Sequence, residues 1–159
     1  SAGYFNNTQP TSSVFSVGNS TYNNASGKNH IAYCFAPSQF ISIGSFEGNA
    51  NTDGTFVPTL NSAGVPLMPI WTLIKAIDSG GKPWVIHDAA RDPYNVASHI
   101  LFAQATTAEG TATSNYIDYV DGGIKIRTSD TQLNIASTLS YLTIGIPIID
   151  VDGRIIAGR

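Results

Sequence analysis

The densest group of ionisable side chains lies between positions 87 and 92, where His87-Asp88 is followed by Arg91 and Asp92. A histidine beside a carboxylate is the usual beginning of general acid-base catalysis. A hydrolase also needs a nucleophile or a second carboxylate nearby, and the sequence has no GxSxG or comparable nucleophile motif. We therefore expect no enzymatic activity and no catalytic residue. Asp88, Arg91 and Asp92 are expected to pin the loop after a strand, with Asp92-Pro93 beginning a turn.

A second pattern, Asn49-x-Asn51-x-Asp53-Gly54, is like the front half of a calcium loop, in which oxygen ligands alternate before a glycine. It departs from that loop at both ends. Asn49 replaces the opening aspartate, and Leu60 stands where a bidentate glutamate is needed. The favoured interpretation is a turn held by Asn and Asp side-chain bonds. Calcium-assisted ligand binding through Asn49, Asn51 and Asp53 is the alternative.

Other residue types give little chemistry. His30, His87 and His99 have no metal-ligand spacing, and Cys34 is the single cysteine, so we expect no metal and no cofactor. Cys34 is predicted to be a small buried hydrophobic residue.

Aromatic side chains offer a different kind of site, because an exposed ring stacks on sugars. Tyr94, Tyr116 and Tyr119 are the candidates, and a core role is equally open for each. Trp71 and Trp84 are expected in the core.

Composition narrows the function classes. Charged residues make up 12% of the 159 residues, and the net charge is -3. This leaves no basic stripe for nucleic acid, and no apolar run approaches the length of a membrane-spanning helix. Ser, Thr and Asn together outnumber the charged residues, a balance typical of secreted β-proteins and virion components.

The elements that must position these residues are strands. Apolar residues alternate with period two in 30–35, 40–46 and 123–128, which predicts half-buried antiparallel strands. Residues 69–77 and 82–88 are expected to form a hairpin through the glycine-containing turn at 78–81. Residues 139–149 read as a buried strand whose end is disrupted by Pro147. Residues 95–102 give only weak helix evidence, and residues 16–29 and 48–69 read as long loops. The fold class is therefore an all-β antiparallel β-sandwich with little helix.

The chain also contains a weak internal echo. At one constant offset, residues 23–36 lie over residues 134–147, with Asn23, Ala25 and Ser26 matching Asn134, Ala136 and Ser137. Both copies read as a turn followed by an apolar strand. Duplication and chance remain open as explanations.

Six segments, taken in order, resemble the concanavalin-like β-sandwich repeat of tail-fibre and other virion structural proteins of tailed bacteriophages. The segments are PTSSVFSVG (10–18), IAYCFA (31–36), GSFEGN (44–49) with TDG (52–54), WTLIK (71–75), WVIHD (84–88) with ARDPYN (90–95), and IKIRT (124–128). The resemblance covers roughly residues 4–146.

The resemblance implies one concanavalin/jelly-roll-like β-sandwich domain over 1–147. Residues 1–36 would be similar to the end of one family repeat, and 37–147 to the body of the next. Residues 148–159 depart from the family and predict a C-terminal arm or hairpin. Its pairs Ile148-Ile149 and Ile155-Ile156 would contact a neighbouring subunit or, equally, its own domain.

The implied function is a non-enzymatic structural protein on the exterior of a bacteriophage virion, either a tail-fibre or appendage module or a capsid decoration protein. Its partners would be other virion proteins and copies of itself, with no nucleic acid and no membrane insertion. A lectin-like module that binds host-surface glycans is the alternative, with ligand-binding candidates Asp88, Arg91, Asp92, Tyr94, Asn49, Asn51 and Asp53.

Overall fold

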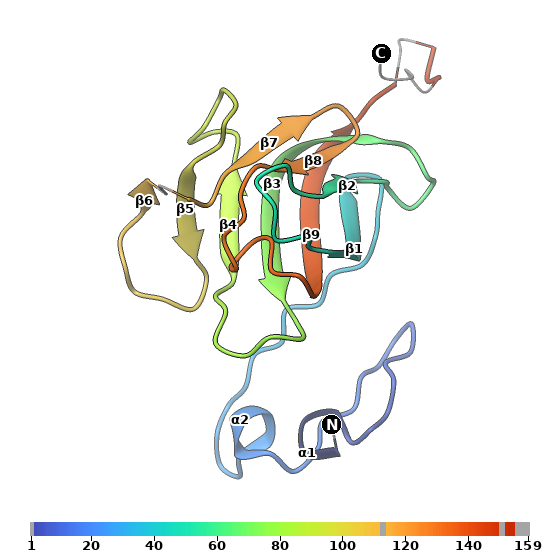
Figure 1. Cartoon of the computed structure of the whole chain (residues 1–159). Helices are drawn as coiled ribbons and strands as arrows, with labels where there is room; N and C mark the ends of the chain where they lie inside the picture. Colours follow the sequence, from blue (N-terminus) through green and yellow to red (C-terminus); the bar gives the residue numbers. More distant parts are fainter. Residues whose placement is uncertain (1, 112–113, 150–151, 155–159) are drawn as a thin grey trace. The chain divides into compact units, whose positions relative to one another are not determined.

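The computed structural model describes residues 2–111, 114–149 and 152–154 (Figure 1). The chain divides into two compact units, Ser1–Phe35 (unit 1) and Ala36–Arg159 (unit 2). No helix within the described residues is long and apolar enough to span a membrane.

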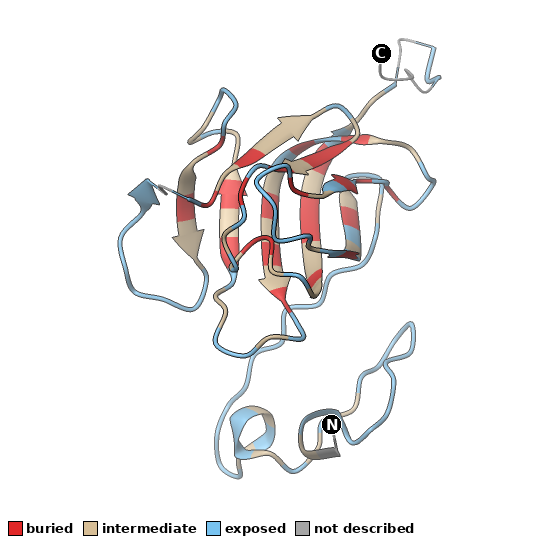
Figure 2. Ribbon diagram, viewed as in Figure 1, coloured by how far each residue is buried: buried red, intermediate tan, exposed pale blue. Residues whose placement is uncertain are grey.

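Unit 1 is built from two single-turn helices, α1 (Ala2–Phe5) and α2 (Thr21–Asn24). Ser20 caps α2, because its side-chain oxygen accepts the Tyr22 N–H. The rings of Tyr4 and Tyr22 stack with centroids 6.2 Å apart, and the Asn23 side chain donates to the Tyr4 carbonyl oxygen at 2.7 Å. Every unit 1 residue whose burial is described is exposed or intermediate (Figure 2). Local hydrogen bonds therefore organise this unit, rather than a core.

Unit 2 contains two antiparallel sheets, an arrangement consistent with a β-sandwich. The six-stranded sheet has the order β1-β9-β3-β4-β5-β6, and the three-stranded sheet has the order β2-β8-β7. The strands are β1 (Ile41–Glu47), β2 (Phe56–Pro58), β3 (Leu67–Ala76), β4 (Val85–Asp88), β5 (His99–Phe102), β6 (Gly110–Thr111), β7 (Ile117–Val120), β8 (Gly123–Ile126) and β9 (Thr138–Pro147).

The core lies between the two sheets, where β7 and β8 cross one face of the larger sheet (Figure 1). Alternation along each strand turns one set of side chains toward this core. The six-stranded sheet contributes Phe46, Ile74, Ala76, Val85 and Leu139, and the smaller sheet contributes Val57, Ile117, Ile124 and Ile126. Full burial of such a side chain stabilises the fold by roughly 1.5–3 kcal/mol.

Several sequence predictions are confirmed. β1 overlaps the predicted segment 40–46, and β8 lies in the predicted segment 123–128, where Lys125 alternates with buried Ile124 and Ile126. β3 and β4 pair as the predicted antiparallel neighbours. β9 ends at Pro147, as expected for a residue that cannot donate a ladder hydrogen bond.

The predicted strand at 30–35 is wrong. These residues form no ladder, and Ile31 and Tyr33 are each 81% exposed. Cys34 is exposed rather than buried. Alternation gives a segment two faces, but a strand also needs a hydrogen-bonded neighbour, and no described residue supplies one here.

Three further expectations need correction. Trp84 is 41% exposed and precedes β4, so it lies outside the core. The presumed loop 48–69 contains β2, which pairs with β8, and residues 16–29 contain α2. Such short elements carry too few residues to show a period.

Candidate functional site

The loop that follows β4 holds the titratable group that the sequence singled out. Asp88 is the last residue of β4, and its carboxylate accepts the Arg91 backbone N–H at 2.8 Å and the Arg91 Nε–H. Arg91 Nη1 also lies 3.6 Å from Glu109 Oε1. Burial alone would raise the pKa of Asp88, but the bonds from Arg91 lower it below its ordinary value. The predicted pinning of this loop by Asp88 and Arg91 is observed.

Asp92 closes the other end of the same loop. Its Oδ2 accepts the backbone N–H groups of Ser98 and His99 at 2.8 and 2.6 Å, and its Oδ1 lies 2.6 Å from His99 Nδ1. Burial would raise the pKa of Asp92, but the bonds from His99 and Ser98 lower it. The bond from Asp92 in turn raises the pKa of His99. Asp92 therefore holds the loop and orients an imidazole.

The His99–Asp92 pair resembles a base held by a carboxylate, and the His99 side chain is 38% exposed. It can hold a proton near the surface. Covalent catalysis would also need a hydroxyl or thiol within hydrogen-bond reach of the ring, and within the described part of the chain no hydrogen bond joins such a group to His99. The hydrogen bonds between His99 and Asp92 therefore hold the loop in place.

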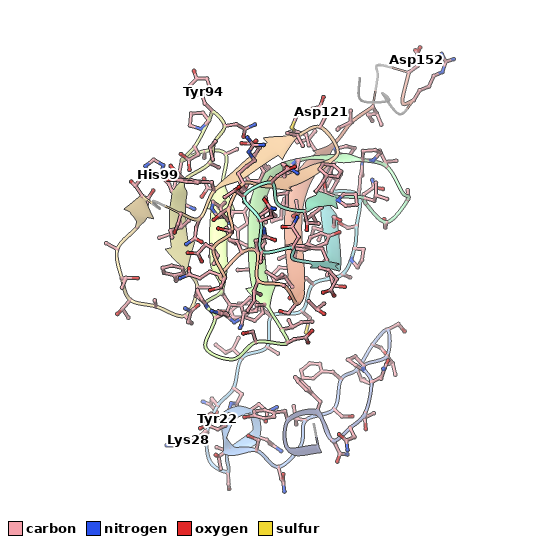
Figure 3. The ribbon with its side chains drawn as sticks, viewed as in Figure 1. Tyr22, Lys28, Tyr94, His99, Asp121 and Asp152 are labelled. Carbon is pink, nitrogen blue, oxygen red and sulfur yellow. The ribbon has the colours of Figure 1, made fainter. Side chains whose placement is uncertain are left out.

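Tyr94 projects from this loop and is 84% exposed (Figure 3). Its neighbour Asn95 fixes the loop to β7, because the Asn95 side chain donates to the Tyr119 carbonyl oxygen at 2.8 Å and accepts the Tyr119 N–H at 2.9 Å. Tyr94 is therefore an exposed ring on an anchored loop. Tyr116 and Tyr119 are only partly exposed, and burial raises the pKa of Tyr119.

His87 lies inside the molecule, at the end of a polar row that crosses the core face of the larger sheet. The row runs through directly paired positions on four neighbouring strands, Ser42, Thr143, Thr72 and His87, all buried. His87 Nε2 lies 3.1 Å from the Asn115 carbonyl oxygen, so the neutral ring carries its proton on Nε2. Burial lowers the pKa of His87 to about 4. The ring has no exposed surface, so it does not work on a solvent-borne substrate.

The loop after β1 shows the predicted Asn and Asp side-chain turn. Asn49 Oδ1 accepts the Asn51 N–H at 3.0 Å, and Asn51 Oδ1 accepts the Asp53 N–H at 2.9 Å. Asp53 pairs with Lys125 Nζ at 2.7 Å, and this bond lowers the pKa of Asp53. The oxygen atoms proposed as calcium ligands thus already accept protein donors. Within the described residues, no group of three or more His, Cys, Asp or Glu side chains is placed to hold a metal ion.

The side chain of Asn134 anchors the loop after β1. It is fully buried, and its Nδ2 donates to Asn49 Oδ1, the Asn51 carbonyl oxygen and the Thr128 carbonyl oxygen at 2.7–2.8 Å. Its Oδ1 accepts the Asn49 N–H at 2.8 Å. The sequence showed Asn134 only as part of the internal echo, because side-chain bonds across 85 positions leave no local pattern.

The first of the proposed assembly residues, Ile148, is hydrogen-bonded to its own unit. The Ile148 N–H donates to the Pro66 carbonyl oxygen at 2.9 Å, and Ile149 is 42% exposed. Ile155 and Ile156 lie outside the described residues. The assembly role of this arm stays a prediction.

The structure thus places the candidate residues in two separate clusters. Asp88, Arg91 and Asp92 share the loop that carries Tyr94, whereas Asn49, Asn51 and Asp53 are bonded to Asn134 and Lys125. Sequence reasoning missed His99 and Glu109 as members of the first cluster. The alternative of a helix at 95–102 left His99 without a defined direction, and its strand is set by pairing with distant residues.

Comparison with known proteins gives one match. Residues 1–145 match the model of a family described as a domain of unknown function, DUF7483. The chain belongs to the DUF7483 family. The match includes unit 1 and most of unit 2, so both units are part of the DUF7483 pattern. Neither the curated proteins nor the solved structures contain a match.

Proposed function

We propose that this DUF7483 chain is a non-enzymatic structural protein of a bacteriophage particle surface, a tail-fibre or appendage module or a head decoration protein of concanavalin-like β-sandwich fold. The resemblance of six segments to the repeats of virion proteins supports a location on a bacteriophage particle. The few charges and many neutral polar residues suit a protein that works through contacts rather than through a charged substrate. The proposal is carried by one surface of unit 2.

That surface is the face of the six-stranded sheet opposite the core, here called the open face. Five apolar residues occupy directly paired positions on five neighbouring strands, Ile43, Leu142, Leu73, Ile86 and Leu101. Ile43 is exposed, Leu73, Ile86 and Leu101 are partly exposed, and Leu142 at the centre of the row is buried. Other apolar residues on or beside the sheet are exposed, namely Met68, Ile70, Trp84 and Ile146. A continuous apolar row on a sheet surface marks a protein–protein contact. The occupant we propose for the open face is another protein subunit of the particle.

The titratable groups support a role without catalysis. The carboxylates of Asp88 and Asp92 accept bonds from Arg91, Ser98 and His99, which hold the loop between β4 and β5. His87 is buried within the core. Each group that suggested acid-base chemistry therefore has a structural use.

A test of this function is the mass of the full chain in solution, by light scattering over a range of concentrations. We expect a defined oligomer, and we expect Ile43→Ser with Ile86→Ser to shift it toward monomer. Val96→Ser is the control, because it removes an apolar group from a loop at an exposure close to that of Ile43, 43% against 38%. A monomer at all concentrations that also fails to bind purified phage particles would overturn the proposal.

Glycan binding is the second candidate, because Tyr94 is an exposed ring on an anchored loop. Labelled protein would be tested on host cells and on surface glycans, with and without EDTA. Saturable binding lost in Tyr94→Ala, and retained in the equally exposed control Tyr22→Ala, would favour recognition over assembly. Binding that is lost in EDTA would favour calcium-assisted ligand binding through Asn49, Asn51 and Asp53.

A further inference from the structure

Within the described residues, the two sheets of unit 2 end in four outer edges, β1 and β6 in the larger sheet and β2 and β7 in the smaller one (Figure 1). The outward N–H and C=O groups of an edge strand are a template for pairing with another chain, so soluble proteins shorten, interrupt or cover their edges. A comparison of the four edges therefore shows which of them is left open to a partner.

The edge of β7 is covered by the segment that precedes β5. Ala97 and Ile117 exchange both of their backbone hydrogen bonds, at 2.8 and 3.2 Å. The Asn95 side chain bonds to both the N–H and the C=O of Tyr119, at 2.9 and 2.8 Å. A strand of another chain finds these groups already occupied.

The edges of β2 and β6 are closed in other ways. β2 has three residues, and its Pro58 has no N–H to offer. The Pro58 carbonyl oxygen accepts the Tyr141 hydroxyl at 3.1 Å. β6 has only two residues, and a very short strand is itself a protection against edge pairing.

The edge of β1 has none of these protections. The strand has seven residues without a proline, lysine or arginine, and its pairing with β9 has no bulge. The Phe40 carbonyl oxygen accepts the Gly145 N–H at 2.9 Å just before β1. The Gly48 N–H donates to the Ser137 carbonyl oxygen just after it. Because bonding alternates along a strand, the even positions of β1 bond to β9 and the odd positions direct their backbone groups outward.

Both ends of this outward edge are in use within the chain. The Ile41 carbonyl oxygen accepts the Ser38 N–H at 3.1 Å, and the Glu47 carbonyl oxygen accepts the Thr55 hydroxyl at 2.7 Å. The Glu47 carboxylate, the one charge on the strand, accepts the Thr138 hydroxyl of β9 at 2.8 Å. The charge is thus held toward β9 rather than across the free edge.

The centre of the edge consists of Ile43 and Ser45, which are both exposed. Among the residues that the structure describes, their outward N–H and C=O groups have no hydrogen-bond partner. An antiparallel copy of the same strand supplies the matching groups. In the register that overlaps the whole of β1, Ile43 lies opposite the partner's Ser45, and four backbone hydrogen bonds form. Glu47 lies opposite the partner's Ile41, so no like charges meet.

We propose that two copies of this chain associate edge to edge, with β1 antiparallel to β1 of the second copy about a two-fold axis at Gly44. A second copy is the natural occupant, because a two-fold contact uses the same groups on both sides. Ile43 and the partner's Ile43 become diagonal neighbours, roughly 7–8 Å apart, and the two open faces then lie side by side. This edge contact is separate from the open-face contact proposed above and does not depend on a particle-surface function.

The test is amide hydrogen exchange along β1 of the full chain, in dilute and in concentrated solution, with the mass of the same samples measured by light scattering. In dilute solution we expect the amides of Ser42, Gly44 and Phe46 to be protected by β9, and those of Ile43 and Ser45 to exchange freely. In the dimer we expect the amides of Ile43 and Ser45 to slow by about 100-fold. The alternating pattern thus becomes continuous protection.

Substitutions at Ser45 change this edge without touching the ladder to β9. Ser45→Pro removes an outward N–H, and we expect it to abolish the dimer. Ser45→Ala is the matched control, because it removes the side-chain hydroxyl and keeps the N–H. Ser45→Lys is a second variant that places like charges at diagonal positions, and we expect it to raise the dimer dissociation constant about threefold. Unfolding of each variant in dilute solution, where every protein is monomeric, checks that unit 2 is intact.

The possible results separate this edge contact from other forms of association. A dimer with protected Ile43 and Ser45 amides, lost in Ser45→Pro and retained in Ser45→Ala, supports the proposal. An oligomer in which these two amides still exchange freely overturns it and leaves the open face as the contact. A monomer at all concentrations overturns it as well. Protection of the two amides in the dilute monomer would show that the chain covers its own edge, which also contradicts the proposal.

Discussion

Units 1 and 2 contain the same local device with two different outcomes. In each, a capped turn held by an asparagine side chain leads into an extended apolar segment. In unit 2 the asparagine is Asn134, which is fully buried, and the following segment is β9 in the middle of a sheet. In unit 1 the asparagine is Asn24, which is exposed, and the following segment has no ladder partner among the residues that the structure describes. Local chemistry thus makes the turn, whereas neighbours make the strand.

Asn24 and Asn134 also differ in how much their side-chain hydrogen bonds contribute to stability. The Asn24 amide faces water, so its bond to Gly18 replaces a bond to solvent. The Asn134 amide is sealed between the β1 loop and the turn before β9, where an unmade bond leaves a buried polar group unsatisfied. Paired substitutions at equivalent positions of the two units therefore test the comparison.

The largest expected effect is that of Asn134→Ala. This change removes four side-chain hydrogen bonds from a buried position. We expect the free energy of unfolding of unit 2 to fall by about 3–4 kcal/mol, measured by urea denaturation. Asn24→Ala should change it by less than about 0.5 kcal/mol. Equal effects from the two changes would break the comparison.

The pH dependence of stability comes next, and His87 contributes to it. Folded His87 takes up a proton only near pH 4, whereas the unfolded chain does so near pH 6.5. Between these values the unfolded state binds more protons, so stability falls as the pH is lowered from 6.5 to 4. The loss attributable to this residue approaches about 3 kcal/mol at the acid end. Urea denaturation at a series of pH values measures it.

The control for His87 is a substitution that keeps a donor for Asn115 but does not titrate, His87→Gln. The difference between the pH profiles of wild type and this variant isolates the contribution of His87. His99 is present in both proteins and contributes with the opposite sign, because its pKa is raised, so its stabilisation is present at low pH and lost as the pH rises. Replacing the exposed His30 of unit 1 removes no buried group. A pH profile that is unchanged in His87→Gln would contradict the assignment.

The smallest effect expected is at the two caps. Asp130→Ala removes the acceptor of the Gln132 N–H at 2.8 Å and of the Ser114 hydroxyl at 3.0 Å, so we expect a loss of about 1 kcal/mol in unit 2. Asp130→Asn should recover part of that loss, because it keeps a cap acceptor. Ser20→Ala, the unit 1 counterpart, should leave the denaturation midpoint of unit 2 unchanged. A shift of that midpoint by Ser20→Ala would show that the units are coupled.

The fold was predictable where the signal is local. Alternation identified β1 and β8, the glycine-containing turn identified the hairpin of β3 and β4, and Pro147 gave the end of β9. Alternation at 30–35 gave a strand that the chain does not form, because pairing depends on a partner and not on the segment. β5 and β6 were missed, since they are short and defined mainly by their neighbours.

The candidate site divides in the same way. The sequence alone determined that Asp88, Arg91 and Asp92 would hold a loop, and that Asn49, Asn51 and Asp53 would form a turn, because those bonds span only a few residues. Tertiary structure alone decided that Asp92 also holds His99, that Asn134 locks the loop after β1, and that five strands align one apolar row on the open face. The reason is physical: side-chain turns follow from neighbouring positions, whereas burial and strand pairing depend on residues brought together from far along the chain.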